Sequence, residues 1–240
     1  MFDHVTIRAS DRAASERFYD LVFGVLGIER TGTDETFVEW NDFSVAVPDD
    51  ENPVTRGLHV GFVAASPEQV DAFWRTGTEA GYASDGEPGP RPEYSEEYYG
   101  GFLLDPDGNS AEAVHHDGLR QGGNVDHVWI RVADVASSKR FYELVAPHAG
   151  FRLATDMPER AQFAGGSGSF SLVAGERPTE AVHVAFTVGS KEPIHRFHEE
   201  LVAAGYRDNG APGERPDYGP GYYAAFVRDP AGTNIELVTR

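Results

Sequence analysis

The sequence contains no cysteine. Without thiols the chain has neither a disulfide framework nor a thiolate metal site, so any bound metal must have nitrogen and oxygen ligands. No apolar run approaches the roughly 18 residues of a membrane-spanning helix. The first residues, MFDHVTIRAS, also lack the basic start and apolar stretch of a secretory signal. We therefore expect a cytoplasmic protein.

Positive charge is scarce as well. Lys and Arg number 20 against 39 Asp and Glu, which gives a formal net charge of -19. Such a surface repels polyphosphates and anionic lipids, so we expect no nucleic-acid partner and no membrane partner. The 240 residues are 40% hydrophobic, which is enough for a packed core. These features leave a globular protein with a small-molecule substrate.

An internal repeat covers almost the whole chain. Residues 2–22, FDHVTIRASDRAASERFYDLV, match residues 125–145, VDHVWIRVADVASSKRFYELV. Residues 89–114, GPRPEYSEEYYGGFLLDPDGNSAEAV, match residues 213–238, GERPDYGPGYYAAFVRDPAGTNIELV. The sequence therefore predicts two similar domains, residues 1–118 and 124–240, joined by a glycine-rich linker at residues 119–123.

Each half begins with an alternating strand followed by a helical pattern, and the same order returns midway through the half. In the first half Val5 and Ile7 alternate with polar residues, and Phe18, Leu21 and Val22 follow at helical spacing. A second strand at residues 58–64 precedes a helix for which Ser66 is the expected N-cap. The pattern predicts an α+β fold of tandem paired βαβββ modules, four in all, at about residues 1–53, 54–118, 124–178 and 179–240.

Two histidines and one glutamate recur at equivalent positions in the two halves. Strand alternation places them on the side opposite the apolar, helix-facing residues, where a curved sheet has its concave face. Two imidazoles and a carboxylate leave open positions on a metal such as Fe²⁺, Mn²⁺, Ni²⁺ or Zn²⁺. The predicted metal ligands are His4, His59, Glu112, His127, His183 and Glu236. The remaining histidines, His115, His116, His148, His195 and His198, are interpreted as surface residues.

Other side chains are candidates for roles around the metal. The alternation that directs the histidines to the concave face also directs a set of neighbours there, and a guanidinium can pair with two oxygens of a carboxylate or enolate. The substrate-binding candidates are Thr6, Arg8, Trp129 and Arg131. The catalytic candidates are Glu112, Glu236, Tyr98 and Tyr222; for the two tyrosines, aromatic packing is the alternative role.

The motifs DHVxIR, RFY and YYxxFxxDPxGxxxE resemble the vicinal oxygen chelate superfamily, which includes glyoxalases, bleomycin-resistance proteins and extradiol dioxygenases. The resemblance covers essentially the entire chain. It implies paired βαβββ modules, six residues that ligate divalent metals, and substrates that chelate the metal through adjacent oxygens. Many two-domain relatives are expected to keep one triad, whereas this chain keeps two.

Several positions depart from the patterns of individual family members. A glyoxalase I has a fourth glutamate ligand near the end of the first module, where this chain has serines and apolar residues at 44–47 and 169–172. An extradiol dioxygenase has a tyrosine ten residues before the last glutamate, where this chain has Phe102 and Phe226. Lys139 is far from the position of the lysine in fosfomycin-modifying relatives. These departures argue against each of the three specific reactions.

We therefore expect a divalent-metal-dependent glyoxalase-like or dioxygenase-like enzyme with isomerase, lyase or oxygenase chemistry. The alternative is a small-molecule binding protein of the bleomycin-resistance kind, which sequesters its ligand without catalysis. Two points stay open at this stage. His4 can share a metal with His59 and Glu112 or, through module swapping, with His183 and Glu236. The chain can be a monomer, as an internal pseudo-dimer, or a homodimer.

Overall fold

The computed structural model describes residues 1–166 and 168–240. It confirms an α+β fold of four βαβββ modules. The first two modules contain β1 (Phe2–Arg8), α1 (Arg12–Leu26), β2 (Gly32–Thr33), β3 (Phe37–Trp40), β4 (Phe43–Ala46), β5 (His59–Val63), α2 (Pro67–Glu79), β6 (Ser84–Pro90), β7 (Tyr99–Leu104) and β8 (Ser110–His115).

The last two modules repeat this order with one additional short 3₁₀ helix. They contain β9 (Val125–Val132), α3 (Val135–Ala149), β10 (Arg152–Met157), β11 (Arg160–Ala164), β12 (Ser169–Ala174), β13 (His183–Thr187), α4 (Lys191–Ala203), β14 (Arg207–Glu214), η1 (Pro216–Tyr218), β15 (Tyr223–Arg228) and β16 (Asn234–Thr239).

Local sequence determines where the helices begin and end. Asp11 caps α1 by accepting a hydrogen bond from the Ala14 backbone N–H, and Ser66 accepts one from Gln69 at the start of α2, as predicted. Gly27 ends α1 in the left-handed region at φ 73°, a conformation that favours glycine. The chain can therefore turn back sharply from α1 toward β2.

Each sheet combines one module from each half of the sequence. One sheet has the order β14-β15-β16-β13-β1-β4-β3-β2, and the other has the order β10-β11-β12-β9-β5-β8-β7-β6. The central seams are antiparallel: β1 pairs with β13, and β5 pairs with β9. The modules therefore pair first with fourth and second with third. The division into domains at residues 119–123 stays a prediction from the repeat, since each sheet draws on both sides of it.

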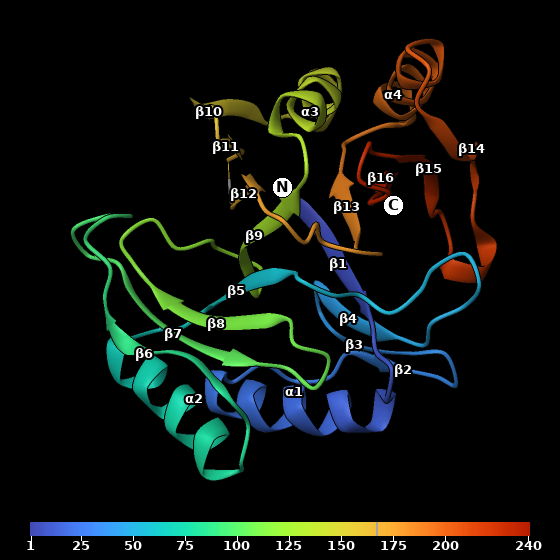
Figure 1. The fold of residues 1–240 in the computed structure, drawn as a ribbon. Helices are drawn as coiled ribbons and strands as arrows, with labels where there is room; N and C mark the ends of the chain where they lie inside the picture. The colour runs from blue at the N-terminus through green and yellow to red at the C-terminus, as the bar shows by residue number, and fades with distance from the viewer. Residues whose placement is uncertain (167) are drawn as a thin grey trace.

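The helices lie on the outside of the two sheets (Figure 1). α1 packs against α2 and α3 packs against α4, so each helix pair belongs to one half of the sequence. The apolar sides of the strands are buried beneath these helices. Phe18 and Phe23 of α1 and Phe62 of β5 are fully buried where the first helix pair meets the strands. The apolar residues occupy the helix-facing side, and the opposite, concave face remains available for polar groups.

The linker is attached to the sheet that contains β1. Buried Arg120 donates from Nη1 to Asp42 Oδ2 at 2.6 Å and from Nη2 to the Phe2 carbonyl at 2.9 Å. Asp42 also accepts a hydrogen bond from the Asn124 backbone N–H at 3.0 Å. These contacts hold the beginning of β9 beside the beginning of β1. Each of these two strands carries one of the predicted histidine ligands.

Candidate metal centres

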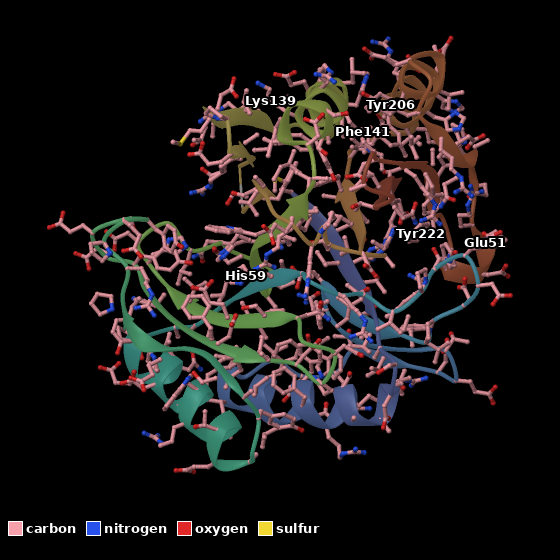
Figure 2. All side chains as sticks on the ribbon, in the orientation of Figure 1. Glu51, His59, Lys139, Phe141, Tyr206 and Tyr222 are labelled. Atoms are coloured by element: carbon pink, nitrogen blue, oxygen red, sulfur yellow. The ribbon has the colours of Figure 1, made fainter. Side chains whose placement is uncertain are left out.

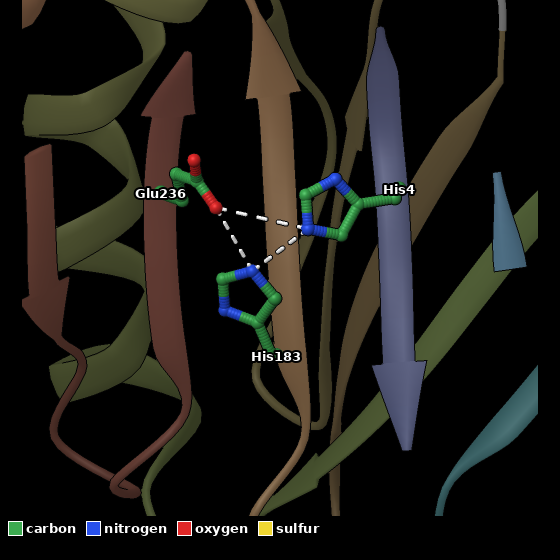
Figure 3. A group of neighbouring side chains, drawn as sticks. All are labelled: His4, His183 and Glu236. Atoms are coloured by element: carbon green, nitrogen blue, oxygen red, sulfur yellow. Dashed lines mark hydrogen bonds and ion pairs between the residues drawn. The ribbon is translucent and has the colours of Figure 1, made fainter. Parts of the chain in front are cut away.

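The six predicted ligands form two clusters, and the module pairing determines which residues meet. Site I consists of His4 on β1, His183 on β13 and Glu236 on β16 (Figure 3). His183 Nε2 lies 3.0 Å from His4 Nε2 and 3.0 Å from Glu236 Oε2, and His4 Nε2 lies 3.7 Å from Glu236 Oε2. Of the two groupings open from the sequence, the structure therefore has the swapped one.

Site II consists of His59 on β5, Glu112 on β8 and His127 on β9. His59 Nε2 lies 2.9 Å from Glu112 Oε2 and 3.2 Å from His127 Nε2, and His127 Nε2 lies 3.1 Å from Glu112 Oε2. The two sites are on different sheets, and His59 of site II is labelled in Figure 2 together with Tyr222, which contacts site I.

The spacing of the ligand atoms fits a divalent ion. An ion about 2.1 Å from each of two ligand atoms, at a right angle, leaves those atoms about 3.0 Å apart. All three separations in site II are close to this value, at 2.9, 3.1 and 3.2 Å. Three mutually perpendicular ligands occupy one face of an octahedron and leave the opposite face open. Two imidazoles and one carboxylate are also the donors that such ions accept.

Neighbouring groups orient the histidine rings. His127 Nδ1 lies 3.0 Å from Asp126 Oδ2, and His4 Nδ1 lies 2.9 Å from Asp3 Oδ1. A proton on Nδ1 leaves the Nε2 lone pair of each ring directed at its cluster. His59 Nδ1 hydrogen-bonds to Ser110 Oγ at 3.1 Å. In these three rings, the nitrogen that faces away from the cluster therefore has a hydrogen-bond partner of its own.

The electrostatics of site II favour an ionised carboxylate. Burial alone would raise the pKa of Glu112, but hydrogen bonds from His127 and His59 lower this pKa to about 2. Burial lowers the pKa of His59, which keeps this ring neutral and able to bind a metal. Burial would also lower the pKa of His127, yet its bonds to Asp126 and Glu112 raise that pKa to about 9. A metal ion bound here would take the place of the proton on His127 Nε2.

Each glutamate uses its second oxygen to accept a tyrosine hydrogen bond. Tyr98 donates to Glu112 Oε1 at 2.8 Å, and Tyr222 donates to Glu236 Oε1 at 2.7 Å. Burial and the adjacent carboxylate raise the pKa of both tyrosines, so both phenols remain protonated donors. Each tyrosine thereby orients its carboxylate so that Oε2 faces the two histidines.

Glycine makes space for the ligands of site II. A Cβ on Gly61 would lie 2.2 Å from Cε1 of His127, and a Cβ on Gly100 would lie 2.3 Å from Glu112 Oε1. In site I, Ala185 on β13 lies opposite His4 and Ala224 occupies the place of Gly100. The ligands of site II are therefore packed more closely against backbone than those of site I.

A cavity of about 260 Å³ opens beside site II and is lined by all three of its ligands. A neighbouring hollow of about 650 Å³ shares His127, Trp129, Tyr94 and Tyr98 with it, so the two are adjacent. The larger hollow also includes His116, which sequence reasoning assigned to the surface. His116 stacks on Tyr98 with ring centroids 5.5 Å apart, and its Nε2 lies 3.2 Å from Asp126 Oδ2. Its stacking partner Tyr98 is distant in the sequence, so no local pattern indicated this position.

The substrate-binding candidates divide between the two sites. Trp129 and Arg131 line the cavity of site II. Thr6 and Arg8 lie at the equivalent places on β1, where Thr6 Oγ1 pairs with Ser44 Oγ at 2.7 Å. Arg8 has a buried Nε that has no hydrogen-bond partner among the described residues. Burial lowers the pKa of Arg8.

Neither cluster gains a fourth histidine or carboxylate from the described residues, which agrees with the serines at the expected position of a glyoxalase I glutamate. A six-coordinate ion held by either cluster would have three positions left for substrate or water.

Within the described residues, no helix is both long enough and apolar enough to cross a membrane.

Two sheets of paired βαβββ modules, each with a two-histidine, one-glutamate cluster that could hold a metal, define the class of protein to which the chain is compared. The family model described as the Glyoxalase/Bleomycin resistance protein/Dioxygenase superfamily matches residues 1–113 and 124–237. The chain belongs to this superfamily. No curated protein gives a significant sequence match.

Solved structures resemble the chain over its full length or over one half of it. Glyoxalase I from Zea mays is 18% identical, with a TM-score of 0.71 over 99% of this chain and 91% of the maize chain. A proposed dioxygenase from Bacillus subtilis is 13% identical, with a TM-score of 0.68 over 99% of this chain and 84% of its own. A glyoxalase/bleomycin resistance protein from Albidiferax ferrireducens is 35% identical over 48% of this chain and 99% of its own, with a TM-score of 0.44. At identities this low, the full-length similarities establish the fold.

Proposed function

We propose that the protein is a divalent-metal-dependent enzyme whose small substrate binds the metal through vicinal oxygens and undergoes isomerase, lyase or oxygenase chemistry. The observation that carries this proposal is the facial arrangement of site II beside a cavity lined by the same three side chains. A metal held there supplies Lewis acidity to a chelated oxygen when it is bound. We assign the ligand roles to His59, Glu112 and His127, with His4, His183 and Glu236 as a second set.

The other residues of site II have positioning roles. Tyr98 keeps its proton and holds Glu112 by donating to Oε1, so that Oε2 is the ligand oxygen. Asp126 holds His127 and is itself bonded to His116. Trp129 covers His59, with ring centroids 5.7 Å apart, and restricts the access of water to that side of the cluster. None of these residues is itself a metal ligand. Each one limits the orientations that a ligand side chain can adopt.

Metal content tests the proposal directly. Protein purified without chelators is reloaded with Fe(II), Mn(II), Ni(II) or Zn(II), and the bound metal is measured by elemental analysis after desalting. We expect about two equivalents per chain, one for each cluster. Glu112→Gln and Glu236→Gln should each remove about one equivalent, because each removes the single anionic ligand of its cluster. Unchanged metal content in the double variant would show that the ligand assignment is wrong.

Turnover separates an enzyme from a sequestering protein. The metal-loaded protein is incubated with hemithioacetals, 2-hydroxyketones and catechols, and substrate loss is followed by chromatography. We expect turnover of one class that depends on Glu112 more strongly than on Glu236, because the cavity adjoins site II. Stoichiometric binding without turnover in fully metal-loaded protein would instead support the bleomycin-resistance type of function.

A further inference from the structure

Arg131 on β9 lines the site II cavity, and Arg160 on β11 lines the neighbouring hollow, which shares Trp129 with that cavity. Arg160 on β11 lies directly opposite Val173 on β12, and Val173 lies directly opposite Arg131 on β9. Residues directly opposite one another in a sheet project to the same face. Arg131 also follows His127 by four residues on one strand, so the arginines share the face of the metal ligands.

The arginine pair lies about one small molecule away from the triad. His59 pairs directly with Trp129 across the seam between β5 and β9. Arg131 is two residues further along β9, a step of about 7 Å along a strand. Trp129 lies between the histidine and the arginines, and the Arg160 guanidinium carbon lies 4.8 Å from the centre of its ring.

Neither arginine forms an ion pair with the described residues. The Arg131 guanidinium donates from Nη1 to the Gly57 carbonyl at 2.6 Å, and Arg160 Nε donates to Ser171 Oγ at 3.4 Å. In a chain with a net charge of -19, two half-buried guanidinium groups next to a cavity without a carboxylate partner are unusual. Their remaining N–H groups suit an anionic ligand.

The acidic residues around the cavity do not offset these arginines. Asp126 is bonded to both His116 and His127, and Glu112 belongs to the triad. Asp85 and Glu93 also line the hollow, but both are exposed to solvent and neither forms an ion pair with the described residues. The inner part of the cavity, once it contains a divalent ion, therefore carries net positive charge.

The walls of the cavity are flat. Trp129, Phe102, Tyr94 and Tyr98 contribute rings, and Arg91 lies over the Phe102 ring at 5.4 Å. Rings and guanidinium planes contact a planar ligand over a larger area than they contact a branched aliphatic one. Shape and charge together indicate a planar anion.

We propose that site II takes a small aromatic carboxylate, with its carboxylate group held by Arg131 and Arg160 and its ring against Trp129. This proposal rests on the proposed function only for the opposite end of the ligand, where vicinal oxygens face His59, Glu112 and His127. The arginine pocket is part of the protein without the metal, so the two proposals can be tested separately.

The test is isothermal titration calorimetry with matched acids and amides. Benzoate, salicylate and phenylpyruvate are compared with benzamide, salicylamide and phenylpyruvamide, on metal-free and on zinc-loaded protein. We expect at least one acid to bind about tenfold or more tightly than its amide, because bidentate arginine contacts recognise the charged carboxylate. If no acid is preferred over its amide in either form of the protein, the proposal is overturned.

Variants assign the effect to the two arginines. Arg131→Met and Arg160→Met should each weaken binding of the preferred acid about tenfold or more and leave the amide within about twofold. Arg152→Met, at an exposed arginine of β10 that lines neither the cavity nor the hollow, is the control and should leave both ligands unchanged. Equal acid binding in wild type, Arg131→Met and Arg160→Met overturns the proposal. Melting temperatures of all variants exclude misfolding as the cause.

Metal binding distinguishes failure of this inference from failure of the proposed function. Arg131→Met and Arg160→Met should bind the same number of zinc equivalents as wild type, since neither side chain belongs to a cluster. Loss of acid preference with zinc retained contradicts only the arginine pocket. Absence of zinc from wild-type protein, with acid preference retained, contradicts only the proposed metal enzyme.

Discussion

Sites I and II contain the same three ligand types on equivalent strands, but they differ in what surrounds the ligands. In site II the Asp126 carboxylate is shared by two histidines, His127 and His116. In site I the equivalent Asp3 bonds to His4 and to Arg240, and Arg240 lies over the Tyr222 ring at 5.1 Å. A permanent cation in site I therefore takes the place of the titratable His116.

The two sites also differ in the exposure of their histidine ligands and in the side chains beside them. The His127 side chain is 7% exposed and lies beside Gly61, whereas the His4 side chain is 19% exposed and faces Ala185. Site II has Trp129 on the strand position where site I has Thr6. A duplicated chain can thus keep two triads and the same Phe and Tyr neighbours while only one of them gains this indole ring. Under the proposed function, we expect site II to carry the reaction and site I to be the less specialised of the two.

The largest expected effect concerns the grouping of the ligands. A variant carrying His4→Ala and Glu236→Gln should lose about one equivalent of metal, because both changes affect site I. A variant carrying His4→Ala and Glu112→Gln should lose about two, because the changes fall on different sites. Elemental analysis of both proteins measures this difference. The reverse result would mean that His4 shares a metal with Glu112.

The next effect tests the close packing of site II. Gly61→Ala places a methyl group 2.2 Å from Cε1 of His127, so the ring must leave its position. Metal affinity at site II should fall about a hundredfold, the upper range for disturbing groups around a ligand. Calorimetry in a Glu236→Gln background isolates this site. Ala185→Gly in a Glu112→Gln background is the control, and equal effects of the two changes would contradict the packing difference.

The smallest of the three effects should be shared by both sites. Tyr98→Phe and Tyr222→Phe each remove the donor to the second oxygen of a buried glutamate. Loss of such an orienting partner lowers metal affinity about tenfold. Zinc titrations with a competing chelator measure both variants. A loss confined to Tyr98→Phe would sharpen the contrast between the sites, and no loss in either would remove the positioning role.

Much of this molecule was predictable because its signals are local or repeated. Strand alternation around His4 and the cap at Ser66 depend on neighbouring residues, and the repeat carried the ligand assignments into the other half. The pairing of modules was not predictable. Pairing the first module with the second, or the first with the fourth, places the same ligand types on a concave face. Only long-range packing distinguishes the two arrangements.

The surroundings of the metal sites were only partly visible in the sequence. Arg131 and Trp129 were candidates because they alternate with buried residues on the strand of His127. Arg160 was not, since its place opposite Val173 depends on the register of three strands. His116 was also missed, because stacking on Tyr98 depends on how two neighbouring segments turn. Spatial neighbours separated in sequence carry no periodic signal.

The nested pairing of modules has a consequence for the order in which the protein is synthesised. All strands of the sheet around site II fall between Ser84 and Ala174 or in β5, so this sheet can close as soon as β12 leaves the ribosome. Strand β1 must wait with an unpaired edge until β13 is made. When β12 has emerged, the cavity-bearing sheet is complete, whereas site I has its first histidine and still lacks the other two ligands.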